Sequence, residues 1–211
     1  MRKIVLFGLA LMLAGCETAY YNAWEKVGIH KRDILVDRIE DTQDAQEDTQ
    51  EQFKDALEQY RAVVNYDGGD LEKIYNKLNA EYEESDKAAK EISVHIDSVE
   101  NVAEDLFEEW EDELGQIKNR TLRDDSAKKL HDTRYKYQKM VKSMRKAEKS
   151  VHPVLETLRD QVLYLKHNLN ARAISALKGE LSTINGDVNQ LILEMQRSID
   201  EANLFIDRIK N

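Results

Sequence analysis

Mostly apolar residues recur every seven positions through the middle of the chain, and a second set follows each of them four residues later. The first set is Leu71, Leu78, Ser85, Ile92, Val99 and Leu106, and the second is Tyr75, Tyr82, Ala89, Ile96, Ala103, Trp110 and Ile117. This alternation predicts one α-helix from about residue 70 to 117, on the order of 70 Å long at 1.5 Å per residue. Partner helices of similar length must cover so narrow an apolar stripe.

The same period continues on both sides of this helix, and it predicts four helices in all, over residues 19–66, 70–117, 124–168 and 171–209. The third helix has apolar positions at Leu130, Tyr137, Met144, Val151, Leu158 and Leu165, supported by Val141, Leu155, Val162 and Leu169. Pro153 lies inside it and predicts a kink, because proline removes one backbone hydrogen bond. In the fourth helix, Gly179 and Gly186 fall on one stripe, where they allow close packing or bending.

Three short breaks separate the predicted helices. Gly68 and Gly69 supply the positive φ angles of a helix end, and Asp70 is a suitable N-cap for the helix that follows. Residues 119–125 form the second break, with candidate caps at its end, and residues 168–171 form the third. Short connections of this kind favour antiparallel neighbours.

These elements predict an all-α fold, a long antiparallel four-helix bundle or coiled-coil-like rod formed by residues 19–211 as one domain. The composition agrees, since 41% of the residues are hydrophobic and 34% charged, with only 8 Gly and a single Pro. The up-down order places the first and third turns at one end of the rod. The second turn lies at the other end, together with the N-terminal and C-terminal ends of the bundle.

The N-terminal residues predict a lipid anchor. A basic start and an apolar run of about ten residues, too short to span a bilayer, precede Leu13-Ala14-Gly15-Cys16. This segment resembles a bacterial lipoprotein signal. The resemblance implies that residues 1–15 are cleaved and that Cys16, the single cysteine, carries diacylglycerol and an N-acyl chain, with residues 16–18 as a short linker. We expect no other cofactor.

The residues after Cys16 bear on the cellular location. By resemblance to lipoproteins of two-membrane bacteria, Glu17 favours the periplasmic face of the outer membrane over the inner membrane. Tyr20, Tyr21 and Trp24 follow closely. They suit either a lipid headgroup layer or the first core layer of the bundle.

The charge of the chain limits its partners. The formal net charge is −10, and an acidic surface of this kind repels phosphate backbones, so nucleic acid is an unsuitable partner. Basic residues nevertheless follow the third helix at Lys139, Lys142, Arg145, Lys146 and Lys149. They can pair with acidic neighbours in the bundle or with another copy, and a solvated or internally paired face is the simpler interpretation.

A polar cluster lies where the third and fourth helices meet. With the glycine turn at the same end, it defines a candidate partner-docking tip, consisting of Gly68, Gly69, Lys166, His167, Asn168, Asn170 and Arg172. The alternative is ordinary turn capping by the asparagines. A docking tip would contact an envelope protein or a cell-wall polymer.

The sequence carries no recognisable catalytic or metal-binding motif. A di-metal site in a four-helix bundle needs Glu-x-x-His on two helices, and no His in this chain has Glu three positions before it. The zinc motif His-Glu-x-x-His and the nucleophile elbow Gly-x-Ser-x-Gly are also missing from the sequence. We therefore expect neither an enzyme nor a metal site.

Four segments of the chain resemble a bacterial family that is known only as a domain of unknown function in presumed envelope lipoproteins. They are YYNAWEKVGIHKRDILVDRIED at residues 20–41, YDGGDLEKIYNKLNAEYE at 66–83, LFEEWEDEL at 106–114 and RDQVLYLKHNLNARAI at 159–174. The resemblance covers essentially the whole mature chain. It implies an envelope location and brings no activity.

The leading functional hypothesis is a non-enzymatic, membrane-anchored scaffold, spacer or adaptor in the cell envelope, with an envelope protein or another copy as its partner. The alternative is a carrier of a lipid or hydrophobic ligand inside a bundle that opens. A carrier requires a loosely filled core. The hint of one is the small residues Thr42, Ala45 and Thr49 on the apolar stripe of the first predicted helix. A membrane-inserting protein is less suitable, because the seams lack a long uncharged run.

Overall fold

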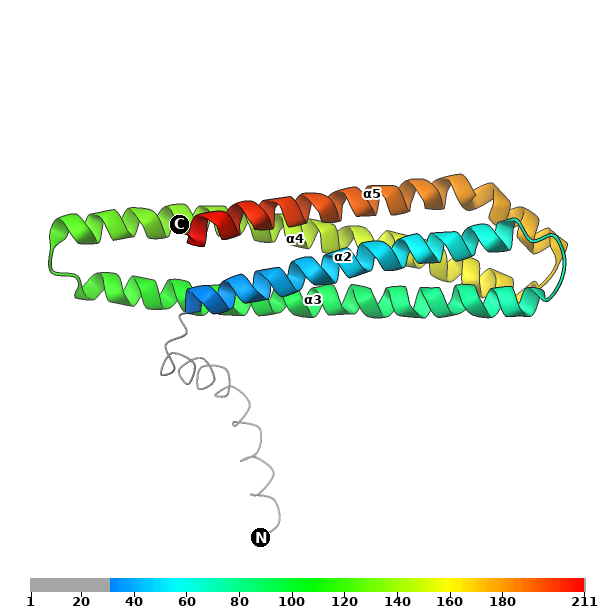
Figure 1. Ribbon diagram of the computed structural model, residues 1–211, viewed down its shortest axis with the longest axis horizontal. Helices are drawn as coiled ribbons and strands as arrows, with labels where there is room; N and C mark the ends of the chain where they lie inside the picture. Colours follow the sequence, from blue (N-terminus) through cyan, green and yellow to red (C-terminus); the bar gives the residue numbers. More distant parts are fainter. Residues whose placement is uncertain (1–30, 211) are drawn as a thin grey trace, which may run out of the picture.

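The computed structural model describes residues 31–210, and the regular elements in that part of the chain are all α-helices. They are α2 (Lys31–Val64), α3 (Leu71–Gln116), α4 (Arg120–His167) and α5 (Ala171–Lys210). The 46 residues of α3 and the 48 of α4 make a rod on the order of 70 Å long (Figure 1). The predicted all-α four-helix bundle is confirmed.

Each helix packs against two neighbours, since α2 and α4 both contact α3 and α5. The four helices therefore form a square in chain order, with antiparallel neighbours. The largest fully buried side chains come from all four helices: Tyr60, Phe53, Leu35, Ile39, Leu78, Ile92, Ile96, Met140, Met144, Leu158, Leu165 and Leu177. The Tyr60 hydroxyl donates a 2.8 Å hydrogen bond to the Leu177 carbonyl, and burial raises the pKa of Tyr60. Its one polar group is thus satisfied inside the core.

The turn between α2 and α3 follows the sequence prediction. Gly68 and Gly69 have φ angles of 133° and 115°, a region that side-chain-bearing residues rarely adopt. The Asp70 carboxylate accepts a 3.1 Å hydrogen bond from the backbone N–H of Lys73. Glycine and the N-cap therefore reverse the chain here.

The start of α4 was predicted wrongly. The helix begins at Arg120, four residues before the expected position, because Asn119 acts as its N-cap. The Asn119 side chain accepts a backbone N–H three residues further on, at 3.2 Å. Asp124 and Asp125 consequently lie within the helix, where Asp125 pairs with Lys129 at 2.9 Å. Nothing between residues 119 and 125 breaks a helix, so the first available cap starts it.

Residues 19–30 of the predicted first helix, with Tyr20, Tyr21 and Trp24, lie outside the described part of the chain. The described part of α2 starts with Lys31, whose ammonium group lies 3.3 Å from the Glu109 carboxylate of α3. The last turns of α3 and the first turns of α4 continue past this point, so the α3–α4 turn forms the far end of the rod (Figure 1). We call this the hairpin end, and the opposite end, which holds the other two turns, the turn end.

Pro153 does not interrupt α4, which runs as one helix from Arg120 to His167. The Thr157 hydroxyl donates to the Pro153 carbonyl at 2.9 Å. Leu169 was expected on the apolar stripe of this helix, but it is 41% exposed because α4 ends two residues before it. The helical period thus stops at the turn.

Gly179 and Gly186 lie on the exposed side of α5, so close packing, one of the two alternatives for these positions, is wrong. A Cβ atom built on either residue meets no atom within 4 Å. Glycine inside a helix costs about 1 kcal/mol relative to alanine. Neither residue recovers this cost through a contact in the bundle.

We expect Gly179→Ala and Gly186→Ala each to raise the free energy of unfolding by about 0.5–1 kcal/mol, as measured by urea denaturation. Gly69→Ala is the matched control and should lower it, because φ at Gly69 is 115°. A loss of stability on either helical substitution would contradict the solvent-facing position of these glycines.

Candidate functional site

The turn end brings together the residues of the predicted docking tip. Gly68, Gly69, Lys166, His167 and Arg172 are all exposed there. No hydrogen bond or ion pair of the three basic side chains appears among the described residues. They are therefore available to a partner.

The two asparagines of the tip act as helix caps. The Asn168 side chain donates to the Tyr164 carbonyl at 2.9 Å. The Asn170 side chain accepts the backbone N–H groups of Arg172 and Ala173 at 3.0 and 3.1 Å. For Asn168 and Asn170, turn capping thus accounts for the residue type.

Exposed apolar side chains also lie at the turn end, and the sequence analysis did not predict them as part of the tip. Leu163, Tyr164 and Leu169 are 46%, 41% and 41% exposed. Leu163 and Tyr164 lie between the core positions Val162 and Leu165, so a helical projection would have placed them outside. Residues 161–179 contain no Asp or Glu. The α4–α5 side of the turn end therefore combines apolar and basic groups, next to the acidic Asp67 and Asp70 of the α2–α3 turn.

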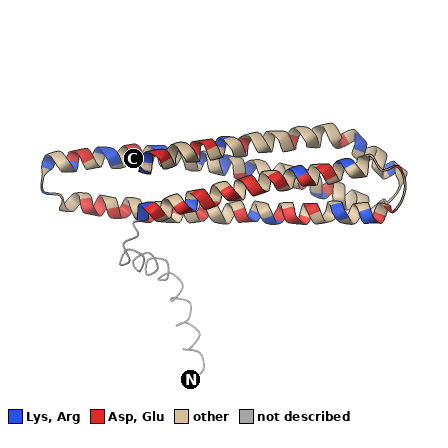
Figure 2. Cartoon of the chain, in the orientation of Figure 1, with Lys and Arg blue, Asp and Glu red and all other residues tan. Residues whose placement is uncertain are grey.

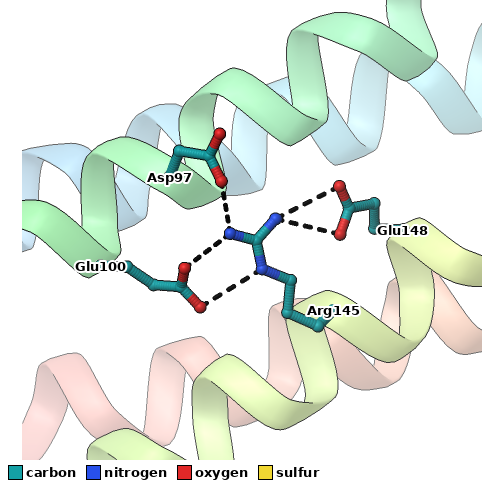
Figure 3. Close-up of polar contacts among 4 residues, drawn as sticks. All are labelled: Asp97, Glu100, Arg145 and Glu148. Atoms are coloured by element: carbon teal, nitrogen blue, oxygen red, sulfur yellow. Dashed lines mark hydrogen bonds and ion pairs between the residues drawn. The ribbon is translucent and has the colours of Figure 1, made fainter.

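The basic side chains of α4 mostly pair within the bundle. Arg145 lies between three carboxylates, as Figure 3 shows. It makes two hydrogen bonds to Glu100, at 2.6 and 3.2 Å, one to Asp97, and two to Glu148, at 3.1 and 3.2 Å. The hydrogen bond to Glu100 is the main cause that raises the pKa of Arg145. Because Asp97 and Glu100 belong to α3, this cluster joins α3 to α4.

Two lysines connect α4 to α5 in the same way. Lys139 donates to Glu201 at 2.8 Å, and Lys146 donates to Glu194 at 2.6 Å. The hydrogen bond from Lys146 lowers the pKa of Glu194, and Arg197 lowers it further. The internally paired interpretation of the basic face holds for these residues. For Lys142 and Lys149, the described residues provide no ion pair.

A polar layer crosses the middle of the core, and the sequence analysis predicted only part of it. It consists of Thr42, Gln46, Thr49 and Gln50 from α2 and Ser198 from α5, all at most 7% exposed. Both amide atoms of Gln46, the Gln50 Nε2 and the Ser198 Oγ lack a hydrogen-bond partner. Thr42 and Thr49 donate to carbonyls of their own helix at 2.8 and 2.7 Å. The expected small-residue section is therefore filled by glutamine side chains.

A groove of about 620 Å³ lies between α3 and α4 near the hairpin end. Phe107, Tyr137 and Val141 supply its apolar lining, and the Phe107 and Tyr137 rings meet edge to face with centroids 5.2 Å apart. Burial raises the pKa of Tyr137, so this phenol stays neutral. Along the α3 side the groove carries Glu100, Glu104, Glu108 and Glu111. Figure 2 shows this concentration of acidic residues on the last turns of α3.

The described residues 31–210 offer neither a metal-binding cluster nor a membrane-spanning helix. That part of the chain holds no group of three or more His, Cys, Asp or Glu side chains arranged for a metal ion. None of its helices is apolar over a stretch long enough to cross a bilayer. Cys16, the predicted lipidation site, lies outside the described residues.

Fold and surface together define the class of this protein, which is a helical rod with a mixed basic and apolar end. The chain belongs to the family described as "Protein of unknown function (DUF2959)", whose model matches residues 20–209. No curated protein and no solved structure matches it. The resemblance to a family of unknown function is thereby confirmed. The description of the family names no activity.

We expect Arg145→Met to lower the free energy of unfolding by about 1–2 kcal/mol, because it leaves three carboxylates without their common partner. The loss should shrink at high salt, which screens the repulsion among the carboxylates. Lys142→Met, at an exposed position without an ion pair, is the matched control and should change stability by less than about 0.5 kcal/mol. Equal effects of the two substitutions in urea denaturation would contradict a structural role of the Arg145 cluster.

The lowered pKa of Glu194 predicts a pH dependence. The ionised carboxylate is favoured in the folded chain, so its contribution is complete above the ordinary pKa of 4.5 and is lost as the pH falls through the lowered value. The free energy of unfolding should therefore decline below pH 4.5 less steeply in Glu194→Gln than in the unmodified chain. Lys146→Met removes the main hydrogen-bond donor and should flatten the same range. Unchanged slopes in denaturation at pH 3–5 would refute the assignment.

Proposed function

We propose that the chain is a non-enzymatic lipoprotein that acts as a helical scaffold, spacer or adaptor in the cell envelope. Residues 1–15 are the cleaved signal, and Cys16 carries the diacylglycerol and N-acyl chains that anchor it to the periplasmic face of the outer membrane. The support for the anchor is the sequence Leu13-Ala14-Gly15-Cys16 after a basic start and an apolar run. Two lipid groups suffice for stable membrane attachment.

The observation that carries the adaptor role is the position of the exposed apolar and basic side chains. Leu163, Tyr164 and Leu169, with Lys166 and Arg172, lie at the turn end, far from the point where α2 begins (Figure 1). An exposed apolar group rimmed by charged residues is typical of a protein-binding surface. A rod anchored near its hairpin end would hold this surface on the order of 70 Å from the membrane.

The alternative role as a carrier of a hydrophobic ligand gains little support. The section of the core that suggested it contains the buried polar side chains of Gln46 and Gln50. Such groups lose hydrogen bonds to water without compensation when an apolar ligand lies against them. The remaining core layers are filled by large apolar residues such as Phe53 and Ile92.

Photo-crosslinking in living cells tests the adaptor role. A photoreactive residue at Lys166 or Arg172 should give a discrete adduct with a different protein, at least tenfold stronger than from Val94 and Leu193. These two control positions are 67% and 53% exposed on the middle of α3 and α5. Asn168 and Asn170 are unsuitable probe positions, because both cap helices.

The Cys16→Ser variant is the control for the anchor, and it should lose both acyl labelling and the adduct. Equal adducts from the turn end and from the controls would refute a docking surface at the turn end. Acylation that persists in Cys16→Ser would refute the anchor.

A further inference from the structure

The face formed by α3 and α4 near the hairpin end holds charges that the bundle does not use. Glu104 and Glu108 line the groove on the α3 side, and Lys142 lines it on the α4 side. Within the described residues none of the three has an ion pair or a hydrogen bond. Each is therefore free to pair with charges of another molecule.

The outer side of α4 forms a ridge beside this groove. Tyr135, Gln138, Lys142 and Lys149 follow one another at helical spacing on the side opposite the core residues of α4, and all four are exposed. Tyr135 is 66% exposed, which is unusual for a large aromatic side chain. The face thus has an acidic groove with an apolar lining on one side and a basic ridge with an exposed aromatic ring on the other.

We propose that a second copy of this chain occupies the groove, with the two rods side by side and parallel. The α4 ridge of each copy lies against the glutamates on the α3 side of the other copy's groove. Groove and ridge match in charge and in apolar character, so the same contact forms twice around a two-fold axis.

Symmetry and charge together select the parallel orientation. A two-fold axis that runs along the helices keeps the rods parallel and exchanges their sides, so the α3 glutamates of each copy face the α4 lysines of the other. An axis that crosses the helices makes the rods antiparallel and sets α3 against α3 and α4 against α4. That arrangement opposes Glu to Glu and Lys to Lys, which is unfavourable.

The register within one copy identifies the contacts. Arg145 pairs with Glu100, and Arg134 pairs with Glu111 at 2.5 Å. Because α3 and α4 are antiparallel, a higher residue number in α4 lies level with a lower residue number in α3. In a parallel pair, equal residues of the two copies lie at equal heights. Lys142 is therefore level with the second copy's Glu104, and Tyr135 reaches the second copy's groove near Glu111.

This arrangement goes beyond the proposed function and is compatible with it. Parallel rods begin at the same end, so that both Cys16 residues can enter one membrane. Copies held on a surface also meet at a raised effective concentration, which favours a contact too weak to persist in dilute solution.

Crosslinking between copies of the full chain in cells tests the orientation. Cysteine replaces His131 or Lys149, which are exposed near the two ends of the ridge and about 27 Å apart along α4. With a short bismaleimide, we expect each variant to crosslink with itself. When the two variants carry different affinity tags and are mixed, the crosslink between His131→Cys and Lys149→Cys should be at least fivefold weaker than either self-crosslink. Leu193→Cys, on the outer side of α5, is the matched control and should give no crosslink.

The charge pattern has its own test in the same assay. Glu104→Lys or Lys142→Glu should each lower the yield at least fivefold, and the combination should restore it, because the swapped pair keeps opposite charges level with each other. In membranes isolated from these cells, raising the salt concentration from 50 to 500 mM should lower the crosslinking yield of the variants that keep Glu104 and Lys142.

Three results would overturn the proposal: no crosslink from either position, a crosslink between the two different variants that is stronger than the self-crosslinks, which indicates antiparallel rods, or no rescue by the charge swap. The chain without an added cysteine tests the lipid anchor independently of the pairing of the rods. A crosslink through its Cys16 would show an unmodified thiol and refute lipidation, and the same assay in a Cys16→Ser background would still report the orientation.

Discussion

The structure depends on the burial of four apolar stripes of similar length, none of which can be covered by a single neighbour. A large apolar side chain gains about 1.5–3 kcal/mol when it is fully buried, and the buried positions continue from Leu35 in α2 to Phe205 in α5. Each helix consequently contacts two others, and the chain closes into a square. Because the apolar core repeats along the whole rod, it tolerates a proline inside a helix, Pro153, and a buried polar side chain, Gln46.

The narrowness of the stripes explains the highly charged surface. Only one side of each helix enters the core, so the remaining positions face water and hold Asp, Glu, Lys and Arg. Contacts such as Arg145 with Glu100 and Lys146 with Glu194 then cross between neighbouring helices. Partly exposed ion pairs of this kind add little stability individually, but they disfavour other registers of one helix along another.

Two regions with exposed apolar side chains lie toward the two ends of the described rod. At the turn end the helices stop, and Leu163, Tyr164 and Leu169 remain partly exposed. Near the hairpin end, Tyr135 lies on α4 beside the groove of α3 and α4. The first region suits a partner beyond the tip of the rod and the second suits a neighbour at its side. An anchored scaffold that works in pairs would use both.

The sequence by itself determined the helices, their antiparallel order and the glycine turn, because heptad spacing, Gly68-Gly69 and Asp70 act over a few residues. It failed at the start of α4, where both Asn119 and Asp124 suit an N-cap and the helix begins after the first of them. The residues of the candidate tip lie together at the turn end, but the exposed apolar side chains beside them were not predicted, and its two asparagines act as caps. Which charges are paired, which remain free beside the α3–α4 groove, and which side of each rod is exposed were decided by the tertiary structure. These properties depend on distances between residues far apart in the chain, and periodicity carries no information on them.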